Sequence, residues 1–229
     1  MQVEPRVAAA VRLLERHGVR AEAMLDIGCS DGGISRLVAS VTGARRVYGV
    51  DVDPDSVIEA RARGVSAFLC DVSRERIPLP SSAVDLVTAF EVIEHLLDPD
   101  HMLSEAWRVL RSGGYLLAST PNLGSWVNRL LLLAGYQPYT AEVSAKTMYG
   151  VAVRGGSYGS RPSGHIRPFT LRAFREILEA NGFRVLELVG APGVEPRNRV
   201  FRLVDRLMAR RPSLARRLVA LAVKTGKGD

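Results

Sequence analysis

The sequence has only two cysteines, Cys29 and Cys70, among its 229 residues. They form no CxxC pair and stand in no metal-ligand spacing, so we expect neither a disulfide framework nor a metal site. The low cysteine content suits a reducing cytoplasm, where we expect the chain to act. No window holds eighteen consecutive apolar residues, and no transmembrane helix is predicted. The first residues lack the basic-then-apolar order of a secretory signal.

Lysine is also scarce, with three lysines against 28 arginines. The formal net charge of +7 lies mostly at one end of the chain. Residues 197–229 carry ten basic and two acidic side chains. A basic tail of this kind can meet nucleic acid, anionic lipid or an acidic substrate. A solvated face in an arginine-rich protein is the plainer interpretation, and we favour it.

Short apolar runs alternate with helical patterns over the first half of the chain. The apolar runs predict strands at 24–27, 46–51, 65–70, 84–90 and 115–120. Helical spacing and end signals predict helices at 5–17, 35–41, 54–63 and 99–110, the last closed by the SGG at 112–114. Unbroken apolar strands that alternate with helices predict a parallel sheet with helices on both faces.

The regular pattern breaks at Pro121 and returns at Thr170, the expected N-cap of a helix. We therefore predict one domain over residues 1–229 with an insertion, or lid, at about 121–168. The apolar stretch from Leu123 to Ala134 predicts a helix that packs as a lid on the sheet edge, or else meets an apolar ligand or membrane surface. The glycine-rich stretch at 150–164 predicts a flexible loop. The later elements are expected at 170–181 (helix), 183–190 (strand), 198–210 (helix covering the sheet) and 217–224 (strand).

The loop after the first strand carries the clearest functional signal. It reads DIGCSDGG from Asp26 to Gly33. Glycines let a ligand approach the backbone, and a helix N-terminus offers free N–H groups. Asp51 ends the second strand, the position from which a carboxylate binds a ribose diol. The pattern predicts a nucleoside cofactor. Asp26 and Asp31 would repel a pyrophosphate but attract the ammonium and sulfonium of S-adenosylmethionine.

Other nucleotide-binding classes leave signatures that this sequence lacks. A short-chain dehydrogenase would carry a Tyr-xxx-Lys pair, but the residues four before the lysines are Glu142, Ala220 and Val223. No phosphate-binding GxxxxGK[ST] is present. A nicotinamide-dependent oxidoreductase and a catalytically inactive cofactor-binding subunit remain as alternatives to an enzyme that uses S-adenosylmethionine.

Taken together, these motifs resemble the class I S-adenosylmethionine-dependent methyltransferases, a large family that includes ubiquinone and glycan-cluster O-methyltransferases. The resemblance covers nearly the whole chain and rests on residues 24–33, 48–54, 70–73, 90–99, 109–122 and 165–183. It implies a Rossmann-like, seven-stranded, mostly parallel sheet of order 3-2-1-4-5-7-6. The strand at 217–224 would be antiparallel and lie between strands five and six.

The resemblance also implies which residues bind the cofactor, S-adenosylmethionine. They are Asp26, Gly28, Cys29, Ser30, Gly32, Asp51, Val52, Asp71, Val72, Phe90 and Glu91. Asp51 would hold the ribose hydroxyls, Asp71 would accept from the adenine amino group, and Glu91 would lie beside the sulfonium. Ser30 stands where the family usually has glycine, so we expect a slightly remodelled loop.

A hydroxyl acceptor must lose its proton, which makes the histidines of interest as general bases. His95 follows the fourth strand at the carboxyl edge of the sheet, and His165 ends the insertion that should cover this edge. Both are candidate catalytic residues, although His95 could instead hold its loop by a structural hydrogen bond. His17 and His101 lie on helices and are expected to be structural.

The residues just after the fourth strand narrow the class of acceptor. Amine methylation of nucleic acid usually shows an [Asn/Asp]-Pro-Pro-aromatic run there, but this chain reads FEVI at 90–93. A nucleophilic cysteine for cytosine carbon is also absent from that region. We therefore expect O-methylation of a small-molecule, sugar or lipid-like acceptor rather than of nucleic acid. The basic helix at 198–210 adds the interpretation of a peripheral membrane contact.

Overall fold

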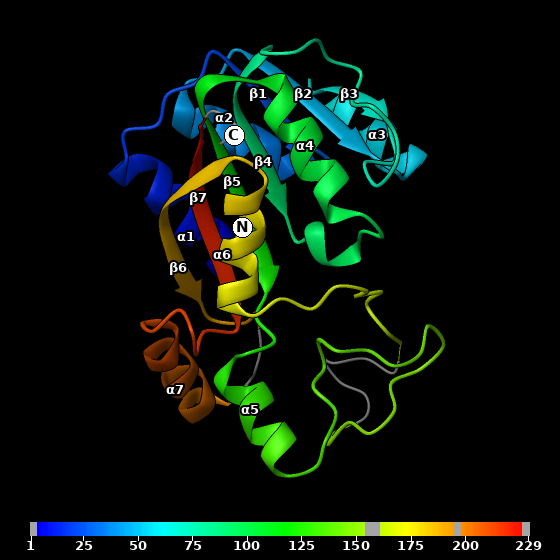
Figure 1. Cartoon of the computed structure of the whole chain (residues 1–229), viewed down its shortest axis with the longest axis vertical. Coiled ribbons are helices and arrows are strands. Elements are labelled where there is room, and N and C mark those ends of the chain that lie inside the picture. The colour runs from blue at the N-terminus through cyan, green and yellow to red at the C-terminus, as the bar shows by residue number, and fades with distance from the viewer. Residues whose placement is uncertain (1–3, 154–160, 195–197, 226–229) are drawn as a thin grey trace.

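The computed structural model describes residues 4–153, 161–194 and 198–225. Its strands form one seven-stranded sheet of order β3-β2-β1-β4-β5-β7-β6 (Figure 1). They are β1 (Ala23–Ile27), β2 (Arg46–Asp51), β3 (Ser66–Leu69), β4 (Val84–Phe90), β5 (Leu110–Pro121), β6 (Phe183–Ala191) and β7 (Arg217–Lys224). β7 is antiparallel to both β5 and β6, and the pairs among β1 to β5 are parallel. The strand order and the antiparallel seventh strand that the family resemblance implies are confirmed.

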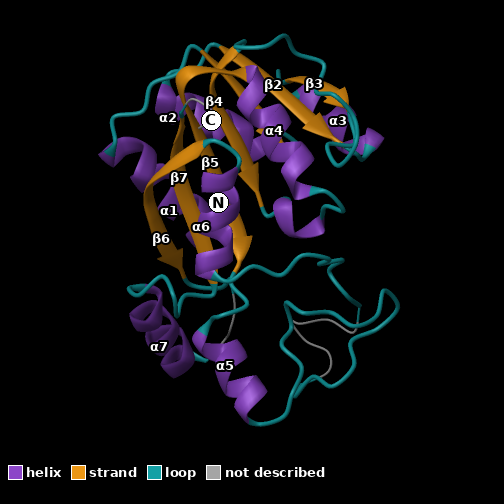
Figure 2. Cartoon of the chain, in the orientation of Figure 1, coloured by secondary structure: helices purple, strands orange, loops and turns teal. Residues whose placement is uncertain are grey.

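Helices cover both faces of this sheet, as Figure 2 shows. They are α1 (Pro5–Arg16), α2 (Gly33–Thr42), α3 (Pro54–Ala62), α4 (Pro99–Val109), α5 (Trp126–Leu133), α6 (Leu171–Ala180) and α7 (Arg199–Ala209), with a short 3-10 turn, η1 (Ile93–His95). One core joins α4 and α6 to the sheet, and the other joins α1, α2 and α3. Every residue of β1 and β4 is buried, because these central strands have helices on both sides.

Local capping explains where several helices begin. Asp53 accepts hydrogen bonds from the N–H groups of residues 55 and 56, with Pro54 at the first helical position of α3. The Thr170 hydroxyl accepts from the N–H of Ala173 at 3.3 Å, which confirms the predicted N-cap of α6. α4 ends at Val109, and the predicted stop at 112–114 instead belongs to the first part of β5, where Gly113 takes a φ of +71°.

The packing of α7 differs from the expectation that it covers the sheet. Within this helix, which is described throughout, only Asp205 and Ala209 are buried, and Val200 is 70% exposed. The reason is a contact with α5. The rings of Trp126 and Phe201 lie 5.0 Å apart, and Trp126 Nε1 donates to Asp205 Oδ1 at 2.9 Å. α7 therefore packs beside α5 beyond the strand ends (Figure 1).

The expectation that the apolar helix is a buried lid is also wrong. Only Asn128 of α5 is buried, and Leu133 is 85% exposed. A polar residue anchors the helix, because Asn128 Nδ2 donates to the carbonyl of Asn122 and to the hydroxyl of Thr140. Contact of this helix with an apolar ligand or membrane stays a prediction. None of the described helices is both long and apolar enough to cross a membrane.

The chain between β5 and α6 lies beyond the carboxyl ends of the parallel strands (Figure 1). An isolated β-bridge between Asn122 and Phe169 joins the two ends of this segment. Residues 154–160, which include most of the glycines of the predicted flexible loop, lie outside the described residues. Ligands of open α/β sheets bind at this edge. The fold therefore places the segment over the expected site.

Candidate functional site

The turn between β1 and α2 is shaped by residues with positive φ. Gly28 takes +70°, and Gly32, the N-cap of α2, takes +78°. A Cβ built at Gly28 would overlap Cγ2 of Val92, so no side chain fits there. Ser30 takes +46°, a conformation that favours glycine. The serine is accommodated there, with its N–H donating to Asp51 Oδ2 at 2.8 Å. The turn thus holds the backbone that follows β1 next to the last residue of β2.

We expect Gly28→Ala to lower the free energy of unfolding by about 2 kcal/mol or more. Left-handed backbone costs a residue with a Cβ roughly 1–2 kcal/mol, and the overlap with Val92 adds to this. Gly43→Ala is the matched control, since Gly43 also has a positive φ (+82°) but no atom lies within 4 Å of the place that a Cβ would take there. Urea denaturation measures both variants. Equal losses in the two would show that the contact with Val92 does not restrict this turn.

A cavity of about 500 Å³ opens beside the turn. Six of the predicted cofactor residues line it, namely Gly28, Asp51, Val52, Asp71, Val72 and Glu91. Val52 and Leu97 on its wall are 70% and 57% exposed. Two large apolar side chains that face the same hollow offer a flat aromatic ligand a surface on which to pack.

The two aspartates on this wall are partly engaged with the protein. Asp51 Oδ2 accepts from the N–H of Ser30, and Oδ1 accepts from the N–H of Asp53 at 3.0 Å. Asp71 accepts from the N–H of Ser73 and pairs with Arg74. Each carboxylate oxygen can accept two hydrogen bonds. Asp51 therefore keeps acceptor capacity for a diol while its orientation is fixed.

The other five predicted cofactor residues do not line this cavity. They are Asp26, Cys29, Ser30, Gly32 and Phe90. Asp26 is 2% exposed and accepts from the hydroxyls of Thr88 (2.6 Å) and Ser35 (2.5 Å). Burial raises the pKa of Asp26 to about 6. Cys29 and Phe90 are buried in the core. Direct cofactor contact by these five residues stays a prediction. Their described contacts are with other residues of the protein and stabilise the turn.

Glu91 lies where the cavity meets the carboxyl end of β5 and the amino end of β7. Its φ is +55°, its Oε1 accepts from the Ser119 hydroxyl at 3.0 Å, and its Oε2 pairs with Arg217 Nε at 2.6 Å. Strained backbone at a non-glycine residue is typical of functional sites. The sequence analysis missed Arg217. Because β7 is antiparallel, its first residue lies at the edge where the parallel strands end, and this placement could have been used to find it.

The two candidate catalytic histidines lie against each other. Their ring centroids are 5.0 Å apart. His95 Nδ1 lies 3.0 Å from the Gly164 carbonyl, which is the structural hydrogen bond considered as its alternative role. A catalytic role for His95 stays a prediction. His17 and His101 contact Glu187 and the Glu75 carbonyl, so both make the structural contacts expected of them.

Glu142, which the sequence analysis also missed, holds the chain on which His165 lies. Its carboxylate accepts from the N–H groups of Ser163, Gly164 and His165 at 2.7, 2.8 and 3.1 Å. His165 Nδ1 lies 3.3 Å from Glu142 Oε1, close but not aligned for a hydrogen bond. Burial lowers the pKa of His165 against the opposing effect of Glu142. A neutral imidazole is thus favoured here, and it can accept a proton.

Glu94 is 1% exposed and lies between these groups. Its Oε2 accepts from the Thr120 hydroxyl at 3.1 Å, and its Oε1 has no hydrogen-bond partner among the described residues. Burial, reinforced by the charge of Glu91, raises the pKa of Glu94 to about 8. The side chain is therefore mainly protonated at neutral pH.

The pH dependence of stability tests this assignment. A carboxyl whose pKa is higher in the folded protein binds its proton more tightly there, so stability falls as pH rises from about 5 to about 8. We expect Glu94→Gln to remove this fall, which is on the order of 2–4 kcal/mol because one pKa unit is worth about 1.4 kcal/mol. Urea denaturation between these pH values measures it. Glu59→Gln on exposed α3 is the control, and parallel pH profiles for wild type and Glu94→Gln would contradict the raised pKa.

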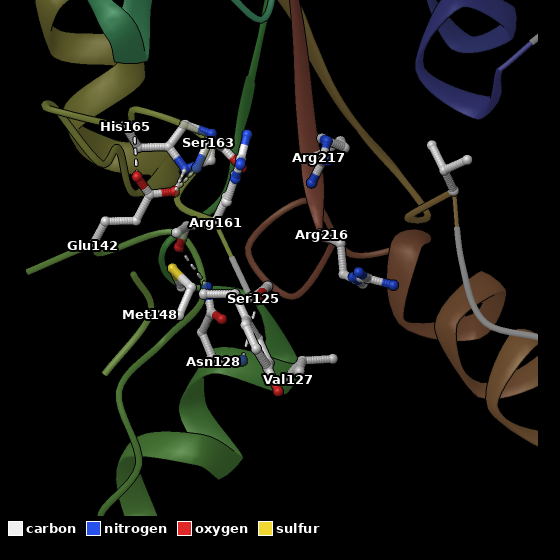
Figure 3. A pocket seen from close by; sticks show the side chains of 13 residues that line it. Ser125, Val127, Asn128, Glu142, Met148, Arg161, Ser163, His165, Arg216 and Arg217 are labelled. Carbon is white, nitrogen blue, oxygen red and sulfur yellow. Dashed lines mark hydrogen bonds and ion pairs between the residues drawn. The ribbon is translucent and has the colours of Figure 1, made fainter. Parts of the chain in front are cut away.

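A second cavity, of about 190 Å³, lies between the chain after β5 and the start of β7 (Figure 3). His165, Glu142 and Arg217 are on its wall. The two cavities are neighbours across a polar partition, because His95 contacts His165 and Glu91 contacts Arg217. A ligand in one cavity and a ligand in the other would meet beside these four side chains.

Comparison with known proteins places residues 25–118 in a family described as the methyltransferase domain. This segment contains the turn, Asp51, Asp71 and the His95 loop. Over residues 25–118 the chain therefore matches a methyltransferase domain, and it is similar to proteins described as S-adenosylmethionine-dependent methyltransferases. The cofactor of the domain is S-adenosylmethionine. The first cavity fits this group, because it offers a carboxylate that can accept hydrogen bonds from a ribose diol and an exposed apolar wall on which adenine can pack.

Curated relatives are similar to about half of the chain. A probable S-adenosylmethionine-dependent methyltransferase of Mycolicibacterium smegmatis is 42% identical over 46% of this chain and 40% of its own length. A mitochondrial ubiquinone biosynthesis O-methyltransferase of Candida albicans is 32% identical over 48% of this chain and 36% of its own length. The chain thus spans about two fifths of the curated relatives that it matches.

Solved structures extend the likeness of fold to nearly the whole chain. An S-adenosylmethionine-dependent methyltransferase from Mesorhizobium loti has a TM-score of 0.63 at 18% identity and covers 94% of this chain and 96% of its own. The [4+2]-cyclase SpnF has a TM-score of 0.60 at 20% identity, covering 96% and 81%. At these identities the likeness concerns the fold alone, and the two names show that one fold serves different reactions.

Proposed function

We propose that this domain transfers the methyl group of S-adenosylmethionine to a hydroxyl oxygen of a small-molecule, sugar or lipid-like acceptor. The contact between His95 and His165 carries the proposal, because it joins the cofactor cavity to a second cavity that has its own polar lining. The name of the Candida albicans relative, an O-methyltransferase, supports oxygen as the methylated atom.

The chain's own residues hold the cofactor on one side of the partition. Asp51 would bind the ribose diol, Val52 would pack on adenine, and Glu91, which Ser119 and Arg217 hold in place, would lie beside the sulfonium. When bound, the cofactor supplies a methyl group on a sulfonium, open to in-line displacement by an oxygen. Position and exclusion of water are what the protein adds.

His165 is the general base of this proposal. It faces the second cavity, and its lowered pKa leaves it neutral and able to take the hydroxyl proton as the oxygen bonds to the methyl carbon. Glu142 lies next to Nδ1, which favours a proton on that nitrogen and a lone pair on Nε2. Glu142 is a positioning residue, because it holds the backbone of residues 163–165 and does not face the methyl group.

The segment after β5 supplies most of the acceptor cavity. Its lining comes from residues 125–165 and from the start of β7. We propose that this segment is the lid of the predicted single domain and determines which acceptor is used. It lies outside the segment matched by the family, so the acceptor is the part of the function that the relatives leave open.

A transfer screen tests the proposed activity. The protein is incubated with S-adenosylmethionine and separate sets of sugars, quinols and hydroxylated lipids, and S-adenosylhomocysteine is measured by mass spectrometry. We expect release of S-adenosylhomocysteine with at least one hydroxyl compound and none without an acceptor. A protein that binds the cofactor but transfers to no member of the sets would favour the inactive-subunit alternative.

A further inference from the structure

The charged side chains that line the second cavity indicate which kind of ligand it can bind. Its cations are Arg161, Arg216 and Arg217, joined by the titratable His165. Arg217 pairs with Glu91, and Arg216 lies 3.8 Å from Asp205 of α7. His165 lies beside Glu142. Arg161 has no hydrogen-bond or ion-pair partner among the described residues, so within this part of the chain its guanidinium is available to a ligand.

The uncharged groups of this cavity add further donors. The hydroxyls of Ser125, Thr140 and Ser163 line it. The carboxylate of Glu142 already accepts three backbone N–H groups and is 4% exposed, so little of its charge is offered to a ligand. A cavity rich in donors and poor in open acceptors suits a ligand that is itself an acceptor.

The direction of the Arg161 side chain distinguishes it from an arginine that extends into solvent. In Figure 3 its side chain points toward the part of the cavity where His165 and Arg217 lie, whereas Arg216 turns toward α7. At about 190 Å³ the cavity is smaller than the roughly 300–1,000 Å³ of drug-sized pockets, so it suits a small polar head.

We propose that the acceptor carries an anionic group, a carboxylate or a phosphate, and that Arg161 binds it within reach of His165. A guanidinium forms paired, charge-assisted hydrogen bonds with either anion. Held by Arg161, the anion fixes the acceptor in the cavity so that its hydroxyl meets the base. This inference rests on the proposed function, because it assigns the class of acceptor for the same reaction.

Binding of small anions tests the site without any methyl transfer. The protein, saturated with S-adenosylhomocysteine, is titrated with inorganic phosphate and separately with acetate, and binding is followed by NMR. We expect saturable binding of at least one anion, weakened about tenfold or more in Arg161→Gln, and unchanged in Arg172→Gln, an exposed arginine of α6. The two probes distinguish phosphate from carboxylate as the preferred group. No saturable binding, or equal binding by Arg161→Gln, would overturn the proposal.

Matched acceptors separate this inference from the proposed function. Transfer to glucose 6-phosphate is compared with glucose, and transfer to 4-hydroxybenzoate with phenol. A preference for the charged member of either pair that Arg161→Gln removes supports the inference. Transfer to neutral hydroxyls alone would overturn it and leave O-methylation standing. Anion binding at Arg161 with transfer to a nitrogen or carbon atom would keep the anion site and overturn O-methylation.

Discussion

His165→Ala is expected to lower kcat by roughly a hundredfold or more, the usual effect of losing a general base. The side chain lines the acceptor cavity and not the cofactor cavity, so the Kd for S-adenosylmethionine should stay unchanged. Steady-state kinetics gives kcat, and calorimetry gives the Kd. Wild-type kcat should also rise with pH through a pKa below the ordinary histidine value, since burial lowers the pKa of His165.

Two histidine variants complete this test. His101→Ala is the control, because His101 lies on α4, away from both cavities, and its ring contacts the Glu75 carbonyl. His95→Ala tests the neighbouring ring, which holds Gly164 and should affect KM more than kcat if its role is structural. A His165→Ala protein with full kcat, or with the wild-type pH profile, would remove His165 as the base.

Asp51→Ala should weaken S-adenosylmethionine binding by at least about tenfold. Two charge-assisted hydrogen bonds to a ribose diol are each worth roughly 1.5–3 kcal/mol, and 1.4 kcal/mol corresponds to a factor of ten. Asp51 also fixes the N–H groups of Ser30 and Asp53, so part of the loss comes from the turn. Calorimetry with S-adenosylmethionine measures the change in Kd.

Asp53→Ala is the control for this variant. Asp53 is two residues away and exposed, and its carboxylate caps α3 rather than lining the cavity. Its loss should lower stability by about 1 kcal/mol with little change in cofactor affinity. An unchanged Kd in Asp51→Ala would reject the ribose assignment and, with it, the placement of the cofactor in the first cavity.

The cofactor half of the site could be predicted because its signals are local in the sequence. The DIGCSDGG turn, Asp51 and Asp71 each lie at the end of a strand that is recognisable by its apolar run, and parallel strands bring their ends to one edge. The strand order followed from the family resemblance, since register and pairing across β5, β7 and β6 depend on contacts far apart in the chain.

The acceptor half could not be predicted, for physical reasons that the structure shows. Glu142 acts on residues more than twenty positions later, and Arg217, the first residue of the antiparallel strand β7, pairs with Glu91. The leucines of α5 indicated a buried helix, but Asn128 and Trp126 determine how it packs. Periodicity reports which face is apolar and not which partner covers it. Single polar anchors of this kind leave no periodic pattern in the sequence.

The central claim is that a methyl group crosses from the first cavity to an oxygen in the second. The most direct measurement uses S-adenosylmethionine labelled with ¹³C in its methyl group and an acceptor identified by the transfer screen. NMR of the purified product then identifies the atom that carries the label. We expect the ¹³C label on a methoxy carbon, with one molecule of S-adenosylhomocysteine formed for each methyl group transferred. A label on nitrogen or carbon, or S-adenosylhomocysteine formed without a labelled product, would contradict it.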